Sequence, residues 1–80
     1  MQGLPLSRTT HAMEMTIQLN GLPYEIPAVM TVSGLLEGLG FGGKPCVVEL
    51  DGEAIFPRDH AVAMVVDGAR VEVVTLAAGG

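Results

Sequence analysis

The sequence of 80 residues predicts a small α+β domain in which a mixed sheet of four to five strands packs on one main helix. Three observations support this fold class. An alternating apolar run near the start folds back on itself at an Asn-Gly turn. A single run with helical spacing follows it, and two more alternating runs with Asp-Gly turns complete the chain. The predicted element order is ββαβββ.

The stretch MTIQLNGLPYEI (15–26) predicts a β-hairpin. Its first half alternates apolar and polar residues, which is the period of a half-buried strand. Asn20-Gly21 favours a two-residue turn, because both residue types tolerate a positive φ. The returning strand is expected to end before Pro27, which cannot donate a ladder hydrogen bond.

The stretch TVSGLLEGLG (31–40) predicts the helix. Its apolar residues have the i, i+3, i+4, i+7 spacing of one helical face: Val32, Leu35, Leu36 and Leu39. Thr31 or Ser33 can cap its start, and Gly40 is placed to end it. Gly34 and Gly38 each weaken a helix by about 1 kcal/mol relative to Ala, so packing must hold it.

The second half of the chain predicts three further strands. The first runs through Leu50 to a turn at Asp51-Gly52, and a short one at 54–56 ends before Pro57. The stretch RDHAVAM (58–64) fits either a turn of helix or a loop. After a second Asp-Gly turn at 67–68, the last strand is expected over 70–76.

Composition and charge exclude several function classes. With 49% apolar and 16% charged residues the chain can form a core, and no apolar run approaches the roughly 18 residues that span a bilayer. No secretory signal is evident in the first fourteen residues. A net charge of −5 disfavours nucleic acid and suits a basic protein partner. The single Cys46 predicts a buried thiol and a cytoplasmic location.

The sequence contains no convincing set of residues for a catalytic site or for a metal site. His60 is expected in a solvated loop, and His11 lies in the N-terminal segment, so neither has the neighbours that a metal site needs. The stretch GFGGKP (40–45) resembles a phosphate-binding loop only superficially. It follows a helix and precedes a strand, which is the reverse of the required order, so a connecting loop is predicted. We expect no catalytic residue, metal or bound cofactor of the chain's own.

The two ends of the chain differ from the domain between them. Residues 1–14 show no period and predict a flexible extension, residues 15–76 form the predicted domain, and residues 77–80 form a flexible tail. The tail ends in Gly79 and Gly80. Without Cβ atoms it can enter a channel too narrow for side chains. Its α-carboxylate is a poor electrophile until activated, and a mixed anhydride with AMP would activate it.

In their order and spacing these motifs resemble the ubiquitin-like β-grasp sulfur carriers, and within them the sulfur carriers of thiamine biosynthesis. The residues that carry the resemblance are MTIQLNG at 15–21, TV..LL..L at 31–39, VVELDGEAIFPR at 47–58 and DG.RVEVV....GG at 67–80. The resemblance implies a carrier and not an enzyme. An E1-like adenylyltransferase would use ATP and Mg²⁺ to adenylate Gly80. Cysteine-derived sulfur would then form a thiocarboxylate, which thiazole synthase would consume.

The resemblance also implies roles for residues near the tail. Gly79, Ala78 and Ala77 would thread into the partner, while Leu76, Arg58 and Arg70 are candidates for docking. For Leu76 a place in the core is an equal alternative, and for the two arginines a solvated surface charge is the default.

Other interpretations of the diglycine end stay open from sequence. The small subunit of molybdopterin synthase shares it but typically has a Pro-Pro pair before its last glycines, where this chain has TLAA. Pro57-Arg58 favours the thiamine branch. Sulfur carriers for tRNA thiolation or amino-acid synthesis, and a ubiquitin-like binding or conjugating module, remain alternatives.

Overall fold

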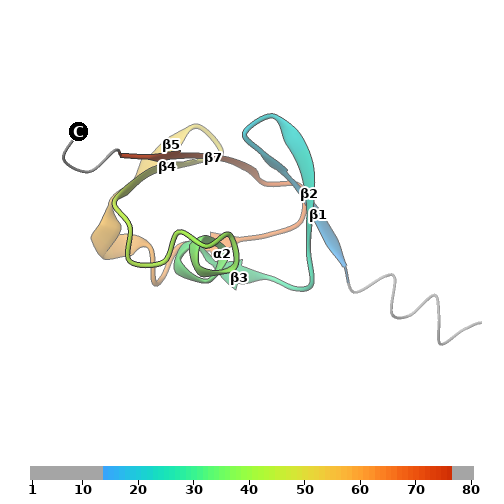
Figure 1. Ribbon diagram of the computed structural model, residues 1–80. Coiled ribbons are helices and arrows are strands. Elements are labelled where there is room, and N and C mark those ends of the chain that lie inside the picture. Colours follow the sequence, from blue (N-terminus) through green and yellow to red (C-terminus); the bar gives the residue numbers. More distant parts are fainter. Residues whose placement is uncertain (1–13, 77–80) are drawn as a thin grey trace, which may run out of the picture.

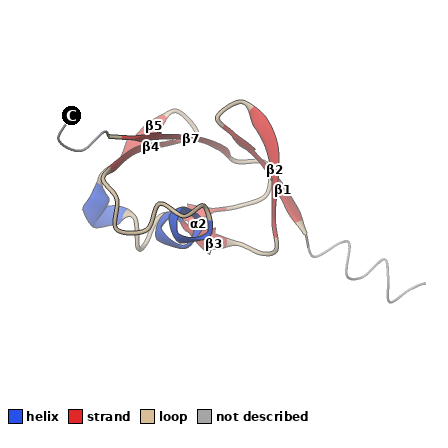
Figure 2. Cartoon of the chain, viewed as in Figure 1, coloured by secondary structure: helices blue, strands red, loops and turns tan. Residues whose placement is uncertain are grey.

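The computed structural model describes residues 14–76 of the chain and leaves residues 1–13 and 77–80 undescribed. One α-helix, one 3-10 helix and seven strands are found in the described part (Figures 1 and 2). They are β1 (Met15–Leu19), β2 (Leu22–Ile26), β3 (Met30–Thr31), α2 (Val32–Gly38), β4 (Cys46–Leu50), β5 (Glu53–Ile55), the 3-10 helix η1 (Pro57–Asp59), β6 (Met64–Val65) and β7 (Arg70–Thr75).

Five strands form one mixed sheet in the order β2-β1-β7-β4-β5. The first and last strands of the described part, β1 and β7, lie parallel at its centre, and the other neighbours are antiparallel. This confirms the predicted α+β class, the ubiquitin-like β-grasp arrangement and the ββαβββ order of the main elements. The sequence prediction missed β3 and β6, a pair of two-residue strands that form a separate small sheet.

The helix packs against one face of the sheet and leaves the other face open, as Figure 1 shows. Alternation along the strands decides which residues are enclosed, so Val71 and Val73 of β7 are buried while Glu72 and Val74 are exposed. The fully buried side chains are all aliphatic and come from both layers: Ile17, Ile26, Val32, Val48, Val65 and Val71. Leu35 and Leu36 complete the helix side of this core.

The predicted turns and caps are confirmed. Asn20 (φ 51°) and Gly21 (φ 84°) join β1 to β2, and Asp51 with Gly52 has nearly the same pair of angles between β4 and β5. At the helix start the Thr31 hydroxyl accepts a hydrogen bond from the Gly34 N–H at 3.0 Å. Gly40, at φ 85°, follows the helix end.

Between the helix and β4, the glycine-rich loop at 40–45 is a connection, as predicted. The thiol of Cys46 is buried at the start of β4, as predicted, and donates to the Lys44 carbonyl oxygen at 3.4 Å. Within residues 14–76 no helix has the length and apolar character required to cross a membrane.

Candidate functional site

Strand β7 carries the chain to its C-terminal tail, and its neighbours fix where the tail begins. It pairs with β4 from Leu50 opposite Val71 to Cys46 opposite Thr75. One residue further, the Leu76 N–H donates to the Pro45 carbonyl oxygen at 3.0 Å. The predicted tail residues Ala77, Ala78, Gly79 and Gly80 come next and lie outside the described residues. The backbone at Leu76, the last residue that the structure describes, is therefore held by β4 where the tail begins.

On its other side β7 pairs with β1 over a short stretch, and a side chain of the following turn holds it beyond that stretch. The pairing of β1 with β7 covers only Gln18–Arg70 and Leu19–Val71, because β1 then turns away at Asn20. The Asn20 side chain continues the ladder. Its Nδ2 donates to the Val73 carbonyl oxygen at 3.1 Å, and its Oδ1 accepts from the Val73 N–H at 2.7 Å. Asn20 thus replaces one strand residue and satisfies both backbone groups of Val73.

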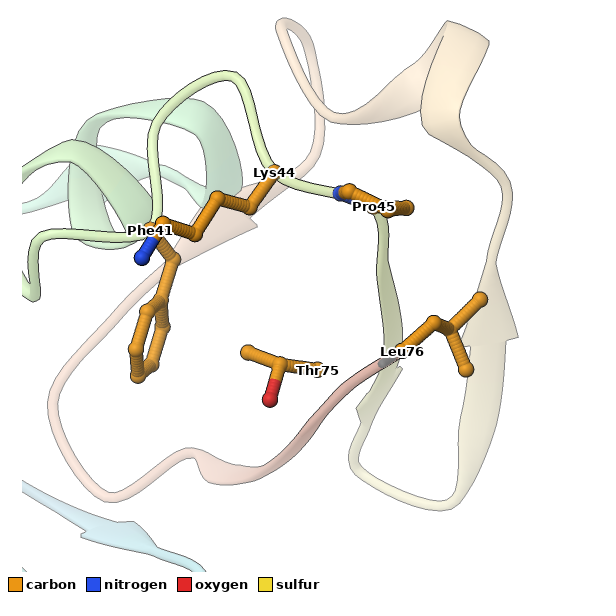
Figure 3. Close-up of a pocket in the computed structure, with 5 residues that line it drawn as sticks. All are labelled: Phe41, Lys44, Pro45, Thr75 and Leu76. Atoms are coloured by element: carbon orange, nitrogen blue, oxygen red, sulfur yellow. The ribbon is translucent and has the colours of Figure 1, made fainter. Parts of the chain in front are cut away.

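A shallow cavity lies at the root of the tail on the helix side of the sheet (Figure 3). It has a volume of about 370 Å³, and its lining is apolar apart from one ammonium and one hydroxyl group: Phe41, Lys44, Pro45, Thr75 and Leu76. In Figure 3 the Lys44 side chain runs back toward Phe41, while Leu76 projects away from it. The cavity thus offers an apolar side chain a place beside the first residues of the tail.

The open face of the sheet carries an apolar row next to the tail. Val47 and Val74 are register partners with exposed fractions of 47% and 57%. Extending the β4–β5 register by one residue places Phe56, 56% exposed, on the other side of Val47. We call these three residues the apolar row. Isolated exposed apolar residues are common, but three in line on β7, β4 and the residue after β5 form a continuous surface that water solvates poorly.

Beside the apolar row lies a pair of carboxylates. Glu49 of β4 and Glu72 of β7 stand directly opposite one another, and with Val47 and Val74 they line a second shallow hollow. Like charges in directly opposed positions of a sheet destabilise it. We therefore expect this pair to cost stability in the free protein.

The candidate docking residues lie around this face. Leu76 is 50% exposed, so it is not part of the core. The Arg58 guanidinium lies 5.1 Å from the centre of the Phe56 ring, at the edge beyond β5. Arg70 opens β7 at the end away from the tail, and its backbone N–H donates to Asp51 Oδ1 at 2.9 Å. Arg58 is thus close to the apolar row, whereas Arg70 is separated from it by Glu72.

The expectation for His60 was wrong. Its side chain is only 9% exposed, and its Nε2 lies 3.2 Å from the Ile55 carbonyl oxygen. Its own carbonyl oxygen accepts from the Ser33 N–H at 2.8 Å. The segment after η1 folds against the start of the helix. His60, although its neighbours in sequence suggest a solvated loop, is therefore buried and connects this segment to the helix. Among residues 14–76 no cluster of three metal-ligating side chains occurs.

Sequence reasoning singled out Leu76 but missed the other residues around the tail root. The alternation in CVVEL and RVEVVT assigns Val47, Glu49, Glu72 and Val74 to one face, but only the sheet order brings them together. The role of Asn20 had no local signal beyond its turn.

Comparison with known proteins agrees with this architecture. The model of the ThiS family matches residues 17–80. A crystal structure of a thiamine biosynthesis protein (ThiS) from Geobacter metallireducens aligns with a TM-score of 0.71 and 29% identity. The alignment covers 82% of this chain and 100% of that one. No curated protein sequence matches the chain.

Proposed function

The chain belongs to the ThiS family, and we propose that it is a sulfur carrier of thiamine biosynthesis whose active group is the C-terminal carboxylate of Gly80. The observation that carries this proposal is the extent of the family match, which runs to the last residue and so includes Gly79 and Gly80. The similar Geobacter protein, whose name places it in thiamine biosynthesis, supports the same pathway.

The chemistry follows from the carboxylate. A partner adenylyltransferase of the E1 type directs an oxygen of the Gly80 carboxylate onto the α-phosphorus of Mg²⁺-bound ATP and releases pyrophosphate. The resulting acyl adenylate is an electrophile, which the free carboxylate is not. A hydrosulfide ion, whose sulfur derives ultimately from cysteine, then attacks the carbonyl carbon, forms the C–S bond and displaces AMP. The product is a thiocarboxylate, and thiazole synthase takes its sulfur.

This chain provides a fixed strand and a narrow tail that can enter a partner's active site, and its partners carry out the catalysis. Pairing with β4 and the Asn20 side chain hold β7 in place, so the tail begins from a fixed base. Ala77 and Ala78 are small and Gly79 has no side chain, so the last residues fit a narrow channel. The carrier is therefore a cosubstrate, and ATP and Mg²⁺ belong to the partner's site.

Docking is proposed to use the exposed residues nearest the tail. Leu76 leads directly into it, and Arg58 lies over Phe56 at the rim of the same face. Arg70 is a weaker candidate, because Glu72 lies between it and the apolar row.

ATP–pyrophosphate exchange tests the first step of this proposal. Purified carrier is mixed with the E1-like adenylyltransferase of the same organism, ATP, Mg²⁺ and labelled pyrophosphate. We expect exchange that depends on the carrier and is lost in Gly80→Ala, because a Cβ at the reacting residue obstructs its approach to the nucleotide. A Gly38→Ala variant, altered on the helix away from the tail, is the matched control and should support normal exchange. Full exchange with Gly80→Ala would refute the role of the tail.

A further inference from the structure

Strand alternation gives the two sides of the tail root different charges. Thr75 lies two residues after the buried Val73, so its side chain points to the same, helix-facing side of the sheet. There it lines a cavity with Lys44. Val74 and Glu72 alternate with these residues along the strand, so their side chains point to the open face. A protein that encloses the tail therefore meets the Lys44 ammonium group, with Glu37 lining a neighbouring hollow beside it, on one side of β7, and the paired carboxylates of Glu49 and Glu72 on the other.

The open face combines two features that are unfavourable in the free protein. The apolar row exposes about half of each of its side chains to water. The neighbouring pair places Glu49 opposite Glu72, at a cost in stability. Both costs are removed if a partner covers the row with apolar groups and places a cation between the two carboxylates.

We propose that this polarity selects the partner: the protein that receives the tail presents an apolar surface with an arginine or lysine to the open face, and an aspartate or glutamate to Lys44. The proposal rests on the proposed function, because it takes the tail as the part that the partner must enclose. The two carboxylates of the open face also disfavour a partner that would present acidic groups there.

Charge favours this occupant over the others that an apolar face can have. A second copy of this chain, docked through the same face, would bring four carboxylates together. Nucleic acid and anionic lipid would both be repelled by Glu49 and Glu72. Arg58 and Arg70 do not reverse this balance. Arg58 lies over the Phe56 ring at the edge beyond β5, and Arg70 lies on the far side of Glu72 from the tail.

Charge reversal on each side of β7 tests the proposal, with the E1-like adenylyltransferase of the same organism as the probe. Glu49→Lys turns the like-charge pair into an attractive pair with Glu72, so its melting temperature should equal or exceed that of the wild type. Its dissociation constant should nevertheless rise by about tenfold or more. Lys44→Glu should weaken binding on the same scale. Glu25→Lys is the matched control, an exposed glutamate on the edge strand β2, and should bind like the wild type.

The outcomes distinguish the proposed charge polarity around the tail, with carboxylates on the open face and Lys44 on the helix side, from the sulfur-carrier function. Weaker binding by Glu49→Lys without loss of stability, together with weaker binding by Lys44→Glu, supports the polarity. If wild-type carrier supports pyrophosphate exchange but both variants bind as tightly as Glu25→Lys, the polarity is refuted and the sulfur-carrier function stands. If the enzyme neither binds nor adenylates wild-type carrier, the proposed function itself is refuted, and the polarity falls with it.

Discussion

Replacing Asn20 by glycine should loosen the strand that carries the tail. Asn20 makes two hydrogen bonds to the Val73 backbone, and Asn20→Gly removes both while keeping a residue that accepts the φ of 51° found there. A typical hydrogen bond contributes about 1 kcal/mol net, so the two together contribute about 2 kcal/mol. For a domain of this size that loss lowers the melting temperature by about 10 °C.

Asn20→Ala separates the hydrogen bonds from the backbone conformation. It removes the same amide but also forces alanine into the left-handed region, at a further cost of about 1 kcal/mol. The expected order of stability is therefore wild type, then Asn20→Gly, then Asn20→Ala. Urea unfolding monitored by far-ultraviolet circular dichroism measures all three, with comparable m-values showing that the same transition is compared.

Amide hydrogen exchange locates the effect. In Asn20→Gly, protection of the Val73 N–H should fall more than that of amides paired between β4 and β7, because only Val73 loses its partner. Unchanged Val73 protection, with an Asn20→Gly stability within about 0.5 kcal/mol of the wild type, would refute the view that Asn20 holds this strand.

The remaining predictions concern the helix and use the same unfolding assay. Gly38→Ala should raise the free energy of unfolding by about 0.5–1 kcal/mol, because a Cβ there meets no atom within 4 Å and the helical backbone gains propensity; a destabilised variant would contradict this. Gly40→Ala, two residues away, should lower it by about 1 kcal/mol, because φ there is 85°, and equal effects of the two changes would show that backbone conformation is not the cause. Thr31→Ala should cost about 1 kcal/mol through the lost bond to the Gly34 N–H, whereas Thr31→Ser, which keeps the hydroxyl, should cost clearly less; similar losses in both would rule out the cap as the source.

Features coded by neighbouring residues could be predicted from the sequence. Asn20-Gly21 and Asp51-Gly52 form the expected turns because a positive φ is a local property. The helical face of Leu35 and Leu36 is likewise evident from spacing.

Features that depend on distant pairing could not be predicted. β3 and β6 are two residues each and exist only because Met30 lies opposite Val65. His60 is buried because its segment folds onto the helix, and no neighbouring residue indicates that. The apolar row combines residues of β4, β7 and the segment after β5, so Val47 and Val74 become one surface only in the assembled sheet.

Intact mass spectrometry tests the sulfur-carrier function most directly. The full chain is incubated with its adenylyltransferase, ATP, Mg²⁺ and a sulfide source, and fragmentation then locates any change. We expect a mass gain equal to replacement of one oxygen by sulfur, located at Gly80 and absent from Gly80→Ala. An unchanged mass with an enzyme that loads another carrier, or a higher-mass conjugate through a lysine of another protein, would contradict the sulfur-carrier function.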